Sequence, residues 1–222
     1  MAPSALNNPG VPRVRWEAAV SRRPVTTRTR ISDLAIDLFD RNGFDDTSVD
    51  DIAAAAGIAR RTLFRYYPSK NAIAWGDFDV HLDDMRTLLD TLPDDLPLAD
   101  ALGQALVAFN DVPEEEAARH RRRMRLLLTV PALQAHSMLM YADWRATIAT
   151  YAAGRLRQGA ADYEPQLIAW LALGTALAAY DQWLADPDEP SAARLRSLLV
   201  EGSRLLSVGI DAALSHTGPA MR

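Results

Sequence analysis

The feature that most constrains the fold is a helical spacing of apolar residues that recurs along most of the chain. In the first such segment, Ile31, Leu34, Ala35, Leu38 and Phe39 follow the i, i+3, i+4, i+7, i+8 pattern of one helix face. No segment alternates apolar and polar residues in the way that a half-buried strand requires. The sequence therefore predicts an all-α protein.

Glycine and proline mark the ends of the expected helices. A first helix from about residue 27 ends near Gly43, and a second one, capped by Ser48, ends at Gly57. A short third helix stops at Pro68, and Ser69 caps a longer fourth helix whose apolar stripe reaches residue 92. Five more are expected at 96–111, 114–129, 131–158, 163–185 and 190–214, which makes nine in total.

Composition excludes several kinds of protein. The chain has 222 residues, of which 49% are hydrophobic, so that a sizeable core can form. Cysteine is absent, which excludes disulfides, thiolate catalysis and cysteine-based zinc sites and suits a reducing compartment. Prolines and arginines interrupt the start where a signal peptide would be apolar, and the apolar run "LIAWLALGTALAAY" is too short to cross a bilayer. We therefore expect a cytoplasmic protein with no membrane partner.

Charge divides the chain into two parts. Residues 1–70 carry 11 Lys and Arg against 8 Asp and Glu, whereas residues 71–222 carry 13 against 21. A basic front part suits nucleic acid, and the acidic remainder suits a second task. We predict a flexible basic arm over 1–26, a DNA-binding domain over 27–73 and a ligand-binding and dimerisation domain over 74–222. The arm is either a solvated tail or a supplement to the DNA contacts.

The second and third helices form a helix-turn-helix pattern. They are joined by "AAAAGIA", in which small alanines allow a close crossing and Gly57 makes the turn. Ile58 and Leu63 are expected to fix the third helix in a three-helix core. Its exposed residues would then offer cations and hydroxyls to a DNA major groove. An ordinary cationic surface helix is the alternative.

Residues 27–73 resemble the N-terminal domain of TetR-family transcriptional regulators. The motifs that carry this resemblance are "F-x-x-x-G-F-x-x-T-S-V", "D-I-A-x-x-A-G-I" and "T-L-F-R-Y-Y-P-S-K". The segment "YPSKNAIAWGDFD" resembles the actinobacterial subgroup found with mycofactocin loci. The resemblance implies a nine-helix layout, a helix-turn-helix reading domain and a helical sensor.

The resemblance also implies roles for single residues. Thr47 and Lys70 match phosphate-contacting positions, and Tyr66 matches an aromatic contact to the DNA backbone. Readout of the base sequence is expected from positions of the third helix that vary among members of the family. Phe64 replaces a frequent tyrosine, and Ala59 replaces a frequent serine before the reading helix. The DNA-binding residues that we predict are Thr47, Arg60, Arg61, Thr62, Arg65, Tyr66 and Lys70.

The last helix carries a repeat that suits a dimer. Leu195, Gly202 and Gly209 recur every seven residues within an apolar stripe, where glycine allows a second backbone to approach. The resemblance implies a homodimer through the last two helices, and an intrachain core is the alternative. The predicted interface residues are Leu195, Leu198, Gly202, Leu205 and Gly209.

The acidic part is rich in aromatic residues and methionines, which suit an adaptable apolar pocket or a plain core. The run "RHRRRMR", residues 119–125, contains arginines with no acid four residues earlier. It is either a solvated basic face or a cationic rim for an amphipathic anion, such as the long-chain acyl-coenzyme A to which several TetR-family members respond. The predicted ligand-binding residues are Trp75, Phe78, His81, Met85, Phe109, His120, Arg122, Arg123, Met124, Leu128, Met140, Tyr141, Trp144, Trp170 and Tyr180.

Signatures of enzymes are missing. The chain has no G-x-S-x-G, Walker A, dinucleotide-binding or H-E-x-x-H motif, and we expect no cofactor and no metal site. The predicted function is a ligand-responsive repressor that binds a palindromic operator as a dimer and is released by an amphipathic small molecule. A helical scaffolding protein that does not bind DNA is the alternative.

Overall fold

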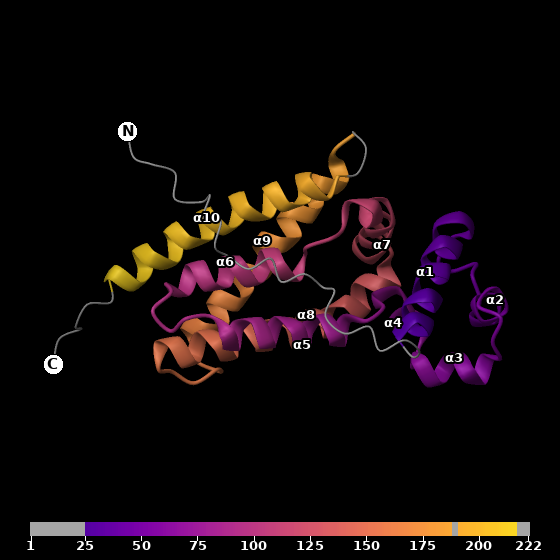
Figure 1. Cartoon of the computed structure of the whole chain (residues 1–222), viewed down its shortest axis with the longest axis horizontal. Helices are drawn as coiled ribbons and strands as arrows, with labels where there is room; N and C mark the ends of the chain where they lie inside the picture. Colours follow the sequence, from indigo (N-terminus) through magenta and orange to yellow (C-terminus); the bar gives the residue numbers. More distant parts are fainter. Residues whose placement is uncertain (1–24, 188–190, 217–222) are drawn as a thin grey trace.

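The computed structural model describes residues 25–187 and 191–216, with side chains for 28–187 and 191–210. Within these ranges the chain forms ten α-helices and one short 3-10 helix, and it contains no strand. The all-α prediction is therefore confirmed. A small group of helices, α1 to α4, lies at one end of the molecule, and α5 to α10 form the rest (Figure 1). The predicted basic arm falls almost entirely outside the described residues.

The small group is built around helices α1 (Val25–Asn42), α2 (Val49–Ala55) and α3 (Arg60–Tyr66). Its core contains the fully buried side chains of Phe39, Ile52, Leu63 and Tyr67. Ser48 caps α2 in a reciprocal capping box with Asp51. No side chain caps α3, because alanine occupies position 59 where a serine is frequent.

The predicted fourth helix is divided into α4 (Lys70–Trp75) and α5 (Phe78–Thr91). Gly76 lies between them with a φ of +64°, a value that side chains with a β-carbon rarely adopt. A β-carbon at this position would also lie 2.4 Å from the Arg123 guanidinium. This division is the reason why the nine expected helices appear as ten.

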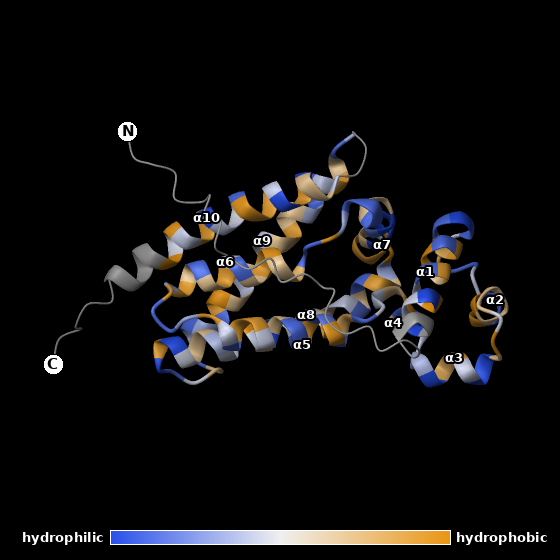
Figure 2. Cartoon of the chain, viewed as in Figure 1, coloured by the Kyte–Doolittle hydropathy of each residue, from blue (hydrophilic) through white to orange (hydrophobic). Residues whose placement is uncertain are grey.

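The larger part contains α6 (Leu98–Phe109), α7 (Ala117–Thr129), α8 (Pro131–Leu156), α9 (Tyr163–Ala185) and α10 (Ala192–His216), with the 3-10 helix Glu114–Glu116 before α7. The most extensive contacts join α8 to α9, α9 to α10 and α6 to α10. Hydrophobic residues predominate along α9, whereas α7 is largely hydrophilic (Figure 2). No described helix is long and apolar enough to cross a membrane.

Candidate functional site

The reading face of α3 has the exposure that the sequence predicts. Arg60, Arg61 and Arg65 are exposed, Thr62 and Tyr66 are half-buried, and Leu63 is completely buried. The guanidinium of Arg65 lies 5.9 Å from the centre of the Tyr66 ring. The buried Leu63 therefore orients the helix so that three arginines face outward together.

Thr47 and Lys70 lie differently from the prediction. The Thr47 side chain is buried, and its hydroxyl donates to the carbonyl oxygen of Gly43 at 2.8 Å. The Lys70 ammonium donates to the carbonyl oxygens of Phe44 at 2.6 Å and of Thr47 at 3.0 Å. Both side chains therefore stabilise the turn between α1 and α2. The inward Thr47 hydroxyl is not aimed at a phosphate, and Lys70 retains one of its three N–H donors for that purpose.

Five of the predicted ligand-binding residues form one aromatic cluster where α4 meets the larger part. Consecutive ring centres are 5.7 Å apart from Tyr141 to Trp75, 5.1 Å from Trp75 to Phe78, 6.0 Å from Phe78 to Phe109 and 6.1 Å from Phe109 to Trp144. Every pair meets edge to face, which is the geometry that ring quadrupoles favour. The rings come from α4, α5, α6 and α8, so the cluster draws together segments far apart in the sequence.

Two polar atoms in this cluster are shielded from solvent, the indole N–H of Trp75 and the hydroxyl of Tyr141. Within the described part of the chain neither makes a hydrogen bond of normal geometry, although the Ser137 side chain lies near the Tyr141 hydroxyl. Burial raises the pKa of Tyr141, so the phenol stays neutral. An unsatisfied buried donor costs about 1–3 kcal/mol, so these two groups offer hydrogen bonds to a ligand that enters the cluster.

A second set of polar side chains is joined by hydrogen bonds. The Tyr180 hydroxyl donates to Asn110 Oδ1 at 2.9 Å and lies 2.8 Å from His120 Nε2. Since the single phenolic proton goes to Asn110, the Nε2 of neutral His120 carries a proton and donates to Tyr180. Burial, assisted by Arg123, lowers the pKa of His120 to about 3. This chain of hydrogen bonds joins α6, α7 and α9.

The remaining apolar candidates divide between the core and the surface. Met85 and Met124 are buried, and Leu128 and Met140 are half-buried against the core. His81 lies on the exposed side of α5. Trp170 is 48% exposed, and Arg145 stacks on its ring at 3.6 Å. We therefore remove Trp170 from the ligand candidates, because α9 turns this side chain outward beside exposed Leu167 and Leu171.

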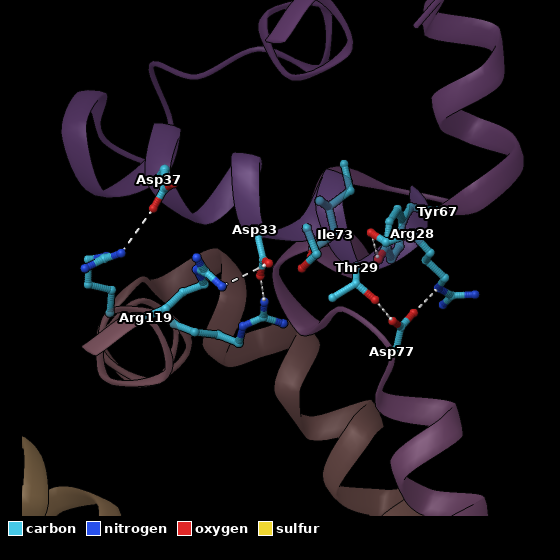
Figure 3. A network of polar contacts seen from close by, with 11 residues as sticks. Arg28, Thr29, Asp33, Asp37, Tyr67, Ile73, Asp77 and Arg119 are labelled. Carbon is cyan, nitrogen blue, oxygen red and sulfur yellow. Dashed lines mark hydrogen bonds and ion pairs between the residues drawn. The ribbon is translucent and has the colours of Figure 1, made fainter. Parts of the chain in front are cut away.

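The arginine run fits neither of the two interpretations drawn from the sequence. Arg119 and Arg123 lie 3.2 and 3.1 Å from the carboxylate of Asp33, and Arg122 lies 3.2 Å from Asp37. These pairs join α7 to α1 (Figure 3). The prediction that Arg122 and Arg123 line a ligand site is corrected on this ground, since their charges are committed to the DNA-binding helices. Arg121 is buried and donates to the carbonyl oxygens of Leu184 and Asp186.

A second set of polar contacts fixes the segment between α4 and α5 against α1. Asp77 lies 2.8 Å from Arg28 and accepts a hydrogen bond of 2.7 Å from Thr29 (Figure 3). The Tyr67 hydroxyl donates to the carbonyl oxygen of Arg28 at 3.0 Å. Arg123, beside Gly76, brings this junction into contact with the ion pairs of α7. Sequence reasoning missed Asp33, Asp37 and Asp77. The signal that could have found the first two is their spacing of four residues, which places two acids on one side of α1.

Comparison with known proteins assigns the chain. Residues 31–74 match the family model of bacterial regulatory proteins of the tetR family, and residues 96–211 match that of the MftR C-terminal domain. A Mycobacterium tuberculosis protein, designated the mycofactocin biosynthesis transcriptional regulator MftR, is 56% identical over 170 residues, which cover 77% of this chain and 86% of the relative.

The chain belongs to the TetR family of transcriptional regulators. Within that family it belongs to the mycofactocin subgroup. The regulator TcmR of Streptomyces glaucescens is 26% identical over 69% of this chain and 68% of its own. Among solved structures, the fatty acid degradation regulator FadR of Bacillus halodurans has a TM-score of 0.60 at 15% identity, over 85% of this chain and 98% of its own. Salmonella enterica GusR has a TM-score of 0.51 at 23% identity, over 84% and 96%. These two structures support the fold.

TetR-family proteins are transcriptional regulators rather than enzymes, and they bind operator DNA as dimers. On the last helix of this member, the predicted dimer residues share one side but differ in what covers them along the helix. Leu195 is buried within the chain, and a β-carbon at Gly202 would lie 2.7 Å from Thr175 of α9. Leu198 is half-buried. By contrast, Leu205 is 72% exposed and Gly209 has open space around it. The prediction is therefore corrected for Leu195 and Gly202, which pack within the chain, and Leu205 and Gly209 stay as interface candidates.

Proposed function

We propose that this TetR-family member is a repressor that binds a palindromic operator as a homodimer and is released by a long-chain acyl-coenzyme A or a similar amphipathic anion. The observation that carries the proposal is the pairing of α7 with α1. It joins a domain with an exposed cationic reading helix to a domain with an aromatic cluster that contains unpaired polar atoms. The 56% identical relative supports mycofactocin biosynthesis genes as the target. Because that target is chromosomal, we place the protein in the cytoplasm.

A dimer suits the exposed apolar residues of the last two helices. Leu167 and Leu171 on α9 and Leu205 and Val208 on α10 are large hydrophobic side chains that the single chain leaves in solvent. Burying them in a second copy would stabilise the pair by the hydrophobic effect. Two copies related by a twofold axis would present two α3 helices to a palindrome, with half-sites about one DNA turn apart.

The aromatic cluster supports an acyl ligand. Edge-to-face rings offer an adaptable apolar surface to a hydrocarbon chain, and the Trp75 N–H and Tyr141 hydroxyl can donate to a carbonyl oxygen such as that of a thioester. Since Arg122 and Arg123 pair with α1, we do not assign the anionic headgroup to them.

Release from DNA would proceed through α7. A ligand that shifts α7 must also displace the carboxylates of Asp33 and Asp37, and with them α1. The coupling is reciprocal, so that operator DNA must weaken ligand binding by the factor by which ligand weakens DNA binding.

DNA binding is tested by selecting operators from a random DNA pool and measuring affinity by gel shift. Arg61→Ala should cost about 1–3 kcal/mol on the selected site and little on random DNA, as expected for a base contact. Lys70→Ala should weaken all sequences about equally, because Lys70 holds the turn before α2. Identical effects of both variants on selected and random DNA would contradict the assignment of readout to α3.

The ligand is tested on the same complex. Acyl-coenzyme A of increasing chain length should dissociate the operator, whereas free coenzyme A should not. Trp75→Phe keeps an aromatic ring, although a smaller one, and removes the unpaired N–H, so it should weaken effector binding about tenfold, the value of one hydrogen bond to a buried group. Operator affinity without ligand should be unchanged. If no chain length dissociates the complex, the ligand class is wrong and the DNA-binding function stands.

A further inference from the structure

An ion pair and an aromatic ring are assembled beside each other on the reading face of α3. Arg60 Nη1 lies 2.8 Å from Asp50 Oδ2, and the Arg60 guanidinium carbon lies 5.6 Å from the centre of the Phe64 ring. Arg60 and Phe64 are four residues apart and therefore share one side of the helix. Asp50 comes from the first turn of α2, so the helix-turn-helix crossing brings the three side chains together.

Charge and polarity make this group unusual for a surface that meets DNA. A carboxylate near phosphates is repelled, and Asp50 is tolerable there only because Arg60 compensates its charge. Phe64 is 41% exposed, although its ring has no polar atom to hydrate or to donate to a phosphate. Such a ring gains most from an apolar partner.

The pairing also directs Arg60. A long unpaired arginine would reach the nearest phosphate, which carries no sequence information. The carboxylate of Asp50 engages Nη1, and the ring of Phe64 supports one face of the guanidinium. The N–H donors on Nε and Nη2 stay available, and two donors of a guanidinium match the O6 and N7 acceptors of guanine.

We propose that Asp50, Arg60 and Phe64 form a preassembled base-reading unit that recognises a guanine next to a thymine in each half-site. Arg60 donates to the guanine edge, Phe64 packs on the thymine 5-methyl group, and Asp50 positions Arg60 without touching DNA. The inference rests on the proposed operator binding and adds the bases and the residues that select them.

The test substitutes single bases in the selected operator. Deoxyuridine lacks only the methyl group of thymine. One such substitution per half-site should weaken wild-type binding about fourfold, the value of about one buried methyl group. The same substitution should have no effect on Phe64→Ala. Replacing the neighbouring guanine by 7-deazaguanine removes the N7 acceptor and should cost about tenfold in wild type, and nothing in Arg60→Ala.

Asp50→Asn separates positioning from contact. It removes the charge that holds Arg60 and also a repulsion from phosphates. Binding to random DNA should therefore strengthen or stay constant, while the loss caused by 7-deazaguanine shrinks. A structural role for Asp50 would instead weaken both kinds of DNA equally. Phe64→Leu, which retains an apolar side chain, serves as the folding control, with helicity followed by circular dichroism.

The outcomes separate this inference from the function on which it rests. If the random pool yields no preferred sequence, operator binding itself is wrong. If an operator is selected, but deoxyuridine at every thymine affects wild type and Phe64→Ala alike, the reading unit is wrong and the regulator remains.

Discussion

Arg123 of α7 and Asp33 of α1 form an ion pair of 3.1 Å that joins the two parts of the chain. Arg123 keeps only 17% of its side chain in solvent, and Asp33 also receives Arg119 at 3.2 Å. Burial lowers the pKa of the Arg123 guanidinium, and the carboxylate of Asp33 counteracts that effect. Asp33 is thus the point on α1 where two arginines of α7 meet.

Asp33→Asn should destabilise the protein and reduce its response to effector. The change keeps the size of the side chain but removes the anion that pairs with the poorly hydrated Arg123, which should lower the free energy of unfolding by about 1–3 kcal/mol. Urea denaturation measures this loss, and gel shifts with and without effector measure the coupling. Asp83→Asn is the matched control, since Asp83 pairs with Arg86 at 2.7 Å on an exposed helix face and should matter by less than about 0.5 kcal/mol. Equal losses of unfolding free energy in the two variants would show that the ion pair between α1 and α7 stabilises the protein no more than an exposed pair does.

Gly76→Ala should destabilise the junction between α4 and α5. Alanine is strained at a φ of +64°, and its β-carbon would displace the Arg123 guanidinium. We expect a loss of about 1–3 kcal/mol in unfolding free energy, together with a changed ratio of operator affinities with and without effector. Gly154→Ala in α8 is the control, because a β-carbon there meets nothing within 4 Å, and helix propensity should make it neutral or stabilising.

Leu205→Glu should separate the dimer while leaving each chain folded. The side chain is 72% exposed in the single chain, so the charge costs little there but would be buried in the proposed interface. Light scattering should report monomers, circular dichroism should report unchanged helicity, and operator affinity should fall. Gly202→Ala provides the contrast: it crowds Thr175 within the chain and should lower stability without changing the oligomeric state. If Leu205→Glu remained a dimer, the interface would have to lie on a surface that does not include Leu205.

His120 should make stability depend on pH. Its pKa is about 3 in the fold, against 6.5 for the free side chain, so between these values the unfolded chain binds the additional proton. The contribution is complete above pH 6.5 and is lost as pH falls toward 3, with a slope of at most about 1.4 kcal/mol per pH unit. Urea unfolding between about pH 7.5 and 5 measures the slope, and His120→Gln should remove it. His81 and His136 remain in both proteins, so that their own titration cancels in the comparison. An unchanged slope in His120→Gln would show that His120 does not titrate in this way.

Local features were readable from the sequence because their causes lie within a few residues. The spacing of Ile31, Ala35 and Phe39 predicts a helix face, and Gly43 and Gly57 end helices where the backbone turns left-handed. The same reasoning placed the arginines of α3 outward, since Leu63 opposite them had to be buried.

Tertiary structure decided which residues contact a given side chain. Arg122 and Arg123 of α7 have no acid four residues earlier in the helix, and their partners in α1 lie 85 and 90 residues away in the sequence, a separation at which spacing carries no information. Gly202 and Gly209 look alike in the heptad repeat, but α9 covers only the first. The sequence by itself determined the helices and their apolar faces through local backbone and side-chain preferences. Only the packing of those helices decided which charges pair, which glycines are crowded, and which hydrophobic residues stay exposed for a partner.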